Sequence, residues 1–430
     1  MRMITAQILL AAIMQLLFIS CHNGGQEKGE KEQLNEQGNI RVPEGFQSHV
    51  LAPSLGSARD VVVRGNGDIY VLLRKSRKGH CMVALRDKDG KGKADSLVYF
   101  GKHCGRGSLV IRNGYLYHST DSSVLRTRFG SKDELVPSGP TQKIVGGFRN
   151  HGQHGNKNFD IDQRGMLYVA VGVPSNACQK ESRTPGSPGM DPCPLLKEHA
   201  GIWKLDADKQ GQHYLEDGVH FSTGIRNMVA IDHNEQTGDL YGVQHGRDQL
   251  HQLFPDRYSK KESAILPAEE MLLIEKGTDF GWPYCYYDGK QDKKVLAPEY
   301  GGDGKKVGRC AEKDDPIAHF PAHFAPNNLE FYHGEQFPEK YRGGAFIAFH
   351  GSWNRNEFDQ WGYNVTFQPF KGKYPDGEHR TFVDGFEGPE RVSSPSQAEY
   401  RPCGLAEGPE GSLYIVDSQK GRLWRIDHTG

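Results

Sequence analysis

A strand, a polar turn containing glycine and a second strand recur along the chain. In one example, the apolar run Phe159 to Ile161 is followed by the turn Gln163-Arg164-Gly165 and the run Leu167 to Val171. Short apolar runs separated by a tight polar turn are typical of a β-hairpin. The same pattern occurs six times, with turn glycines at Gly67, Gly114, Gly165, Gly238, Gly344 and Gly411.

Six such units predict an all-β fold, a six-bladed β-propeller over residues 43–428. One small sheet cannot bury both faces alone, so repeated sheets stack around a channel. Tyr70, Tyr117 and Tyr168 are 47 and 51 positions apart, which is near one blade each. Later units are spaced further apart by inserted loops, notably 174–200 and 255–323. The alternative is a sandwich of unrelated hairpins.

Composition favours a small ligand over a polymer. Glycine accounts for 53 of 430 residues, as expected for many tight turns. The formal net charge is −1, and no long charged run follows residue 35. We therefore expect no nucleic-acid partner.

The N-terminus predicts export. Met1-Arg2 is followed by a mostly apolar run over residues 8–19, which is too short to span a membrane. Residues 1–20 are thus a predicted signal peptide. The segment 17–21 resembles a bacterial lipobox, which predicts lipidation of Cys21, although Phe18 departs from the usual leucine and secretion without lipid is the alternative. Residues 21–42 would form the lipidated N-terminus and a flexible tether. The lipid would be the only membrane contact of a periplasmic or cell-surface lipoprotein of a bacterial envelope.

Seven further cysteines lie in this exported chain, where disulfides can persist. Six cysteines allow 15 pairings, so the sequence leaves connectivity open. The pairs that are close in sequence are Cys81 with Cys104, Cys178 with Cys193, and Cys285 with Cys310, which leaves Cys403 over. No Cys-x-x-Cys-His motif for a covalent haem occurs.

The residues at the start of each inner strand should meet at one end of the channel. They are Arg59, Arg106, His154, Arg226, His323 or Asn328, and Arg401. Together with Arg355, the arginines predict an anion site, because guanidinium groups bind carboxylates bidentately. The alternative is that each arginine pairs with an acid of its own blade, for example Arg59 with Asp60. His154 is the candidate base for a hydroxyl proton, unless it and His151 are ordinary loop histidines.

Several motifs occur together in one order. They are Leu167-Tyr-Val-Ala-Val-Gly172, Ser175-Asn-Ala-Cys178, Thr223-Gly-Ile-Arg-Asn227, Gln244-His-Gly-Arg-Asp248, Asp279-Phe-Gly-Trp-Pro-Tyr-Cys285, His350-Gly-Ser-Trp-Asn-Arg355 and Arg401-Pro-Cys-Gly-Leu-Ala-Glu-Gly408. On these motifs the chain resembles the sorbosone and pyranose dehydrogenase group of six-bladed propellers. That group uses pyrroloquinoline quinone (PQQ) and is distantly related to soluble quinoprotein glucose dehydrogenase. The resemblance covers roughly residues 43–428.

The resemblance implies roles for individual residues. His154 would remove the substrate hydroxyl proton, and backbone carbonyls of Gly246 and Arg247 would hold Ca²⁺. The residues expected to hold PQQ are Arg106, Arg226, Asn227, His245, Arg355 and Arg401. An acid found in the glucose enzymes is Val173 here, and the substrate loops also differ, so glucose specificity is not carried over.

Two aromatic segments and a histidine are candidate substrate contacts. Trp282 and Trp353 could wall a sugar pocket, since sugars stack on aromatic faces, and His323 lies at the predicted channel mouth. Structural burial of both tryptophans is the alternative.

Asp87, Asp89 and Asp95 have the spacing of a short calcium loop. Lys91 stands where such a loop usually carries another oxygen ligand, so an ordinary charged turn is the alternative.

The sequence therefore predicts an exported PQQ-dependent oxidoreductase that acts on a sugar or a related aldehyde or hemiacetal. Without a haem site, electrons must pass to an external acceptor, a cytochrome or a quinone. One alternative is a Ca²⁺-dependent lactonase-like hydrolase, which would need acids and an asparagine at the channel mouth. The other is a non-catalytic propeller that binds glycans or protein.

Overall fold

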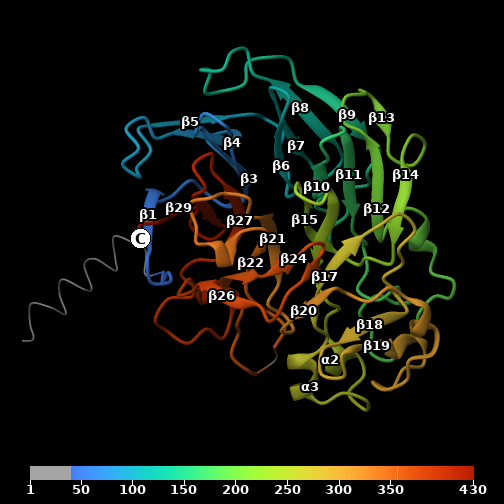
Figure 1. Cartoon of the computed structure of the whole chain (residues 1–430). Coiled ribbons are helices and arrows are strands. Elements are labelled where there is room, and N and C mark those ends of the chain that lie inside the picture. Colours follow the sequence, from blue (N-terminus) through green and yellow to red (C-terminus); the bar gives the residue numbers. More distant parts are fainter. Residues whose placement is uncertain (1–39, 356) are drawn as a thin grey trace, which may run out of the picture. The chain divides into compact units, whose positions relative to one another are not determined.

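Six antiparallel sheets follow one another around a central channel in the computed structural model, which describes residues 40–355 and 357–430 (Figure 1). The predicted six-bladed β-propeller is confirmed. The signal peptide 1–20, the lipidation site Cys21 and most of the predicted tether lie outside the described residues. Residues 40–42 of that tether contact the propeller, because Ile40 is buried in an apolar cluster and Arg41 forms a β-bridge to Asp384.

Each of the first three blades has four antiparallel strands in sequence order. Blade 1 contains β2 (Ala58–Val63), β3 (Ile69–Arg77), β4 (His80–Arg86) and β5 (Ser96–Phe100); blade 2 contains β6 (Leu109–Arg112), β7 (Tyr115–Ser119), β8 (Val124–Arg128) and β9 (Gln142–Gly146); blade 3 contains β10 (Phe159–Ile161), β11 (Met166–Val171), β12 (Gly201–Asp206) and β14 (Val219–Thr223). A short strand from the blade 3 segment, β13 (Gln212–His213), pairs in parallel with β9.

The last three blades repeat this order, except that the outer strand of blade 6 comes from the other end of the propeller. Blade 4 contains β15 (Met228–Asn234), β16 (Asp239–Gln244), β17 (Glu269–Ile274) and β20 (Ala318–Phe320); blade 5 contains β21 (Pro326–Phe331), β22 (Ala345–Phe349), β23 (Asn364–Gln368) and β26 (Arg380–Val383); blade 6 contains β27 (Pro402–Glu407), β28 (Leu413–Asp417), β29 (Leu423–His428) and β1 (Phe46–Ala52). β1 pairs with β29, so the ring closes where blue meets red in Figure 1.

The blades are held together by an apolar cluster at each of the six interfaces between neighbours. Alternate residues of one strand point to opposite faces of its sheet. In β11, Leu167 and Val169 pack against blade 2, whereas Tyr168 and Ala170 pack against blade 4. Both faces of the strand are thus buried, which explains why its sequence is continuously apolar.

Insertions between the strands contain the remaining regular elements. They are α2 (Leu250–Leu253), α3 (Lys260–Ile265), the hairpins β18 (Cys285–Asp288) with β19 (Lys293–Leu296) and β24 (Phe370–Lys371) with β25 (Tyr374–Pro375), and the 3-10 turns Pro194–Lys197, Pro298–Tyr300, Gly308–Glu312, Glu339–Tyr341 and Pro395–Gln397. The three disulfides predicted from sequence proximity are confirmed, and Cys403 is buried as a free thiol. Among the described residues, no helix is both long and apolar enough to cross a membrane.

A single side chain, that of Arg59 on β2, forms hydrogen bonds to the inner strand, or to the segment just before it, of every other blade. Its five N–H groups donate to oxygens contributed by the other five blades: the carbonyls of Arg106, Val229, Asn327 and Cys403 and the side-chain amide of Asn158. Asp60 makes its own contacts instead, accepting from the Leu109 amide at 2.7 Å and from Asn328 at 2.8 Å. The inner strand ends therefore converge as the repeat predicts, around Arg59.

Candidate active site

His154 lies in the segment that leads into β10, with its backbone in the left-handed region at φ 49°. Residues other than glycine seldom adopt this region, and strained backbone of this kind clusters at functional sites. Gly172, just after β11, makes room for the segment. A Cβ atom there would lie 2.7 Å from the carbonyl oxygen of His154. Glycine at 172 therefore allows the backbone of His154 to approach the end of β11.

The imidazole of His154 is held in one tautomer. Its Nδ1 atom lies 2.8 Å from the carbonyl oxygen of Val173. A carbonyl can only accept a hydrogen bond, so Nδ1 carries the proton and Nε2 keeps its lone pair. Burial, reinforced by the positive charge of Arg226, holds the pKa of His154 well below its usual value. The ring is therefore neutral at pH 7, which is the state that a general base needs.

The guanidinium group of Arg226, buried beside His154, already donates hydrogen bonds to other groups of the protein. Its guanidinium donates to Asn176 through two nitrogens, to the carbonyl of Gly246 at 2.9 Å and to Asp248 at 2.7 Å. Asp248 also pairs with Arg183 at 2.9 Å. Burial alone would raise the pKa of Asp248, but the two guanidinium charges outweigh it and hold that pKa below the usual range. Arg226 thus pairs with an acid of its own blade.

His245 and Asn227 lie next to this cluster. Nε2 of His245 donates to the carbonyl of Pro326 at 2.8 Å, and the side-chain nitrogen of Asn227 lies 3.5 Å from Nδ1 of His245. Burial lowers the pKa of His245 to about 4, so this ring is also neutral at pH 7. Two neutral histidines and a compensated ion pair form this part of the site.

Arg401 and Arg355 have guanidinium donors that no described residue accepts from. Arg401 donates to the carbonyls of His350 at 2.8 Å and Gly351 at 3.1 Å, and Arg355 donates to Ala264 at 3.2 Å while its guanidinium lies 3.5 Å from the centre of the Trp361 ring. Within the described residues, Nη1 of Arg401 and Nη2 of Arg355 make no hydrogen bond. Unpaired guanidinium nitrogens in a partly buried site fit a polycarboxylate such as PQQ.

The Gly246 carbonyl is a poorer match for Ca²⁺ than Arg401 and Arg355 are for PQQ. It already accepts from Nη1 of Arg226, so a metal ion would share this oxygen with a guanidinium whose charge opposes it. The side chain of Arg247 forms a buried pair with Glu299, at 2.5 and 2.8 Å, and this pair fixes the backbone next to Gly246. We therefore assign no reaction step to calcium.

The other predicted site residues are placed differently. Arg106 pairs with Asp121 of its own blade, at 2.9 Å, and remains partly exposed. His323 is buried and donates to the carbonyl of Ser263 at 2.8 Å. Trp282 is 6% exposed, and its indole N–H donates to the carbonyl of Asn176. It is therefore buried in the structure, as the alternative interpretation of the sequence predicted. Trp353 is 56% exposed and is the tryptophan available for stacking on a sugar.

Four residues that the sequence reasoning did not single out complete the cluster: Asn176, Arg183, Asp248 and Glu269. Asn176 and Asp248 lie inside the conspicuous motifs 175–178 and 244–248, which was the available signal. Arg183 and Glu269 lie in no motif. Burial raises the pKa of Glu269 to about 8, and its carboxyl group accepts from the amides of Gly246 and Ala325.

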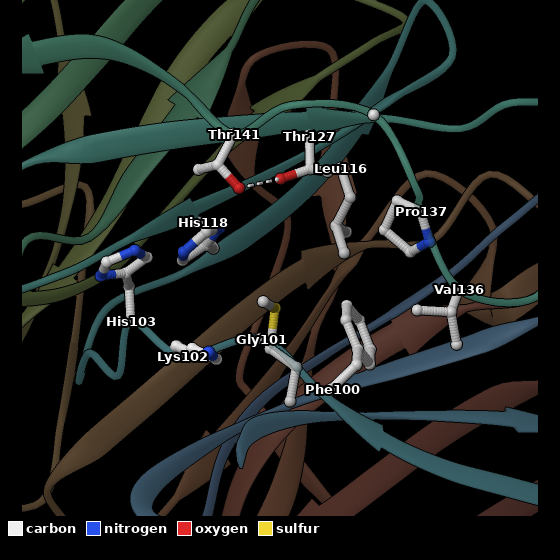
Figure 2. A pocket seen from close by; sticks show the side chains of 12 residues that line it. Phe100, Gly101, Lys102, His103, Leu116, His118, Thr127, Val136, Pro137 and Thr141 are labelled. Carbon is white, nitrogen blue, oxygen red and sulfur yellow. Dashed lines mark hydrogen bonds between the residues drawn. The ribbon is translucent and has the colours of Figure 1, made fainter. Parts of the chain in front are cut away.

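A separate cavity of about 280 Å³ lies between blades 1 and 2 (Figure 2). Met82 and Phe100 line it from blade 1, and Leu116 and His118 from blade 2. Both ring nitrogens of His118 are buried and have no hydrogen-bond partner among the described residues. None of the predicted site residues lines this cavity.

Comparison with known proteins places this arrangement in context. A family model described as TrAA12-like matches residues 40–429. Among curated proteins, an uncharacterised protein of Borreliella burgdorferi is 28% identical over 204 residues, and the match spans 47% of this chain and 47% of that protein. The matched part is thus about half of that relative.

Solved structures share the fold at low sequence identity. The holo form of the pyranose dehydrogenase PQQ domain from Coprinopsis cinerea is 17% identical with a TM-score of 0.71, covering 90% of this chain and 97% of that one. The calcium structure of a family AA12 carbohydrate-active enzyme from Trichoderma reesei is 18% identical with a TM-score of 0.72, at the same coverage. A PQQ-bound aldose sugar dehydrogenase from Streptomyces coelicolor is 16% identical with a TM-score of 0.54, covering 90% and 99%.

Proposed function

The chain belongs to the TrAA12-like family, and on this premise we propose that it is a PQQ-dependent dehydrogenase that oxidises a sugar or a related aldehyde or hemiacetal. The observation that carries the proposal is the state of His154. Its Nδ1–H is committed to Val173, and its neutral ring leaves Nε2 able to take a proton. An alcohol carbon can release a hydride only as its hydroxyl loses a proton, so a base of this kind is the group the reaction needs.

The chain's own residues divide the remaining work. Arg401 and Arg355 offer the carboxylates of the cofactor guanidinium N–H groups that have no partner in the part of the chain that the structure describes. Arg226 and Asp248 form an ion pair beside His154, where burial, reinforced by the positive charge of Arg226, lowers the pKa of the ring and keeps it neutral before substrate binds. Trp353 offers an exposed aromatic face to a sugar ring. When bound, the quinone supplies the hydride acceptor.

Two further parts of the proposal concern the setting of the enzyme. Electrons leave to a separate acceptor, a cytochrome or a quinone, because the sequence has no covalent haem motif.

Export and anchoring follow from the signal-like residues 1–20 and from Cys21. Replacing Cys21 by serine should shift the protein from the detergent phase to the aqueous phase. Unchanged partition into detergent would count against the lipid anchor.

The proposal is tested by adding PQQ to the purified full chain in the presence of Ca²⁺, with a panel of aldoses, ketoses and sugar aldehydes and an electron-accepting dye. We expect dye reduction that depends on PQQ and on one class of sugar. Saturable binding of PQQ without oxidation of any sugar would favour a non-catalytic propeller. Release of acid from a lactone without dye reduction would favour the hydrolase.

A further inference from the structure

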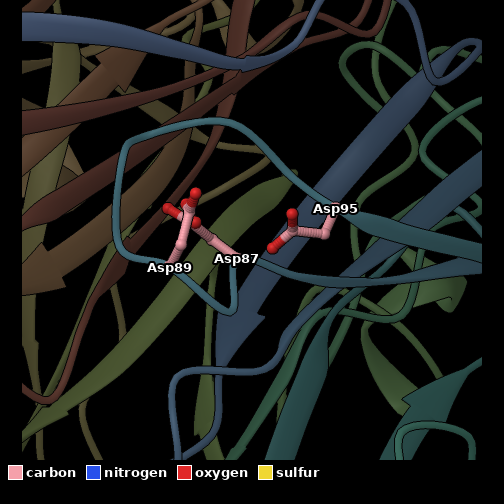
Figure 3. Close-up of side chains that lie close together, drawn as sticks. All are labelled: Asp87, Asp89 and Asp95. Atoms are coloured by element: carbon pink, nitrogen blue, oxygen red, sulfur yellow. The ribbon is translucent and has the colours of Figure 1, made fainter.

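The loop between β4 and β5 brings three carboxylates together at the edge of blade 1. One oxygen of each of Asp87, Asp89 and Asp95 lies within 4.8 Å of the other two (Figure 3). Calcium binds oxygen ligands at about 2.4 Å, so two ligands on opposite sides of the ion are about 4.8 Å apart. The three oxygens are thus close enough to surround one ion.

Asp87 supplies an observation independent of this clustering. Its side chain is 8% exposed. Oδ2 accepts from the amide of Gly92 at 2.8 Å and lies 3.5 Å from Nη1 of Arg425. Oδ1 is buried and has no hydrogen-bond partner among the described residues. A buried carboxylate oxygen without a partner is unfavourable, and a bound cation would satisfy it.

The two other carboxylates are oriented by the backbone of the same loop. Asp95 accepts from the amide of Lys88 at 2.6 Å through Oδ2. Asp89 accepts from the amide of Lys91 at 3.1 Å through Oδ1, and its Oδ2 pairs with the ammonium group of Lys91 at 2.9 Å. The ammonium group of Lys91 thus occupies one of the three carboxylates and opposes a cation there.

We propose that residues 87–95 bind a Ca²⁺ ion through Asp87, Asp89 and Asp95, separately from the candidate active site. Backbone carbonyls of the loop and water complete the six to eight oxygen ligands that Ca²⁺ takes. Magnesium requires a near-ideal octahedron at about 2.0–2.1 Å, whereas Ca²⁺ tolerates the longer and less regular ligand geometry of such a loop.

The position of the loop indicates what the ion does. Gly92 packs on β1, where a Cβ atom would lie 2.9 Å from that of His49, and Ala94 donates to the carbonyl of Leu51 at 3.1 Å. Arg425 of β29 reaches the carbonyl of Gly90 at 3.4 Å. The loop therefore contacts both strands that close the ring, and an ion that orders it stabilises the junction of blades 6 and 1.

The test is a calorimetric titration of the PQQ-free full chain with CaCl₂ after removal of metals, together with its melting temperature. At a hundredfold excess over Kd, binding to the loop should raise the Tm by about 3 °C. Asp87→Asn should lose this heat and this shift, whereas Asp256→Asn, which removes the same charge from an exposed acid elsewhere, should keep both. Calcium bound at other sites contributes the same heat and the same Tm shift in all variants, so these contributions cancel in the comparison.

Lys91→Asp distinguishes a metal site from a charged turn. It places an oxygen at the missing ligand position, so we expect Ca²⁺ affinity to rise at least about tenfold. If the loop were only an ion-paired turn, the same change would lower the Tm and leave the titration unaltered. That result, an Asp87→Asn protein that titrates like the wild type, or equal affinity for MgCl₂ would overturn the assignment.

Discussion

Nδ1 of His154 donates to the main-chain carbonyl of Val173, 2.8 Å away. The carbonyl fixes the tautomer and orientation of the ring, as an acid would, but it adds no negative charge. The negative charge that acts on the ring is that of Asp248, which is shared with Arg226 and Arg183. In the proposed role as base, a protonated His154 would therefore gain less stabilisation from this carbonyl than a carboxylate would give.

Replacing His154 by glutamine should separate catalysis from cofactor binding. Glutamine keeps hydrogen bonding but cannot accept a proton, so the rate at saturating PQQ should fall about 10²–10⁴-fold while PQQ affinity is kept. His151→Gln is the matched control, since His151 lies three positions earlier and its Nδ1 bonds the carbonyl of Gln153. Near-normal maximal turnover of His154→Gln, measured with excess Ca²⁺, would falsify the assigned base.

Arg401 and Arg226 should respond differently to truncation. Arg401→Ala removes a partly free guanidinium, so PQQ binding should weaken by about 1.5–3 kcal/mol, and activity should recover at high PQQ. Arg226→Ala instead leaves Asp248 buried beside Arg183 alone, so it should also destabilise the fold by about 3 kcal/mol.

A PQQ titration of activity and a urea melt of both variants check this contrast. Unaltered PQQ affinity in Arg401→Ala would place the cofactor clamp elsewhere.

Arg59→Met should destabilise the propeller by more than about 3 kcal/mol, because it leaves oxygens of five blades unpaired in the buried channel. Lys75→Met, an exposed change in the same blade, should alter stability by less than about 0.5 kcal/mol. The measurement is the free energy of unfolding in urea. A loss for Arg59→Met no larger than for Lys75→Met would show that the channel contacts carry little stability.

His118 should make stability depend on pH. Burial lowers its pKa to about 4, from about 6.5 in the unfolded chain. Between these values the unfolded state binds more protons, so the stability contributed by neutral His118 is present above pH 6.5 and is lost as the pH falls.

His118→Phe removes this dependence and fills part of the cavity (Figure 2). Relative to wild type, the variant should gain up to about 3 kcal/mol between pH 6.5 and pH 4. The other titrating groups contribute equally to the stability of both proteins, so their contributions cancel in the difference between the two stabilities. Parallel stability curves for the two proteins would exclude a buried neutral His118.

The fold could be predicted from the sequence because its signals are local. In five of the six hairpins the predicted turn glycine, such as Gly165 at φ 86°, adopts a backbone conformation that other residues avoid, and in blade 5 this residue is Gly343 instead of the predicted Gly344. Disulfide partners such as Cys178 and Cys193 were found by proximity, because the two cysteines of each bridge are at most 25 positions apart.

The partners of the charged residues could not be predicted in the same way. Arg59 satisfies oxygens from blades that are up to 344 positions away in sequence, and no local pattern encodes that distance. The repeat predicted that Arg226 reaches the channel end, but its pairing with Asp248 depends on the side-chain directions in the folded blade. The burial of Trp282 likewise depends on the packing of a distant loop around Asn176.

The pairing of β1 with β29 joins Phe46 to His428, about 380 residues apart. Closing a chain segment of this length costs about 5 kcal/mol of entropy by the logarithmic estimate, so this contact should be among the last to form during folding. Until β29 has been synthesised, β28 and β1 each present an open strand edge that can pair with another chain. Blade 6 is therefore where a newly made chain is most exposed to aggregation, and where protection by a chaperone would have the greatest effect.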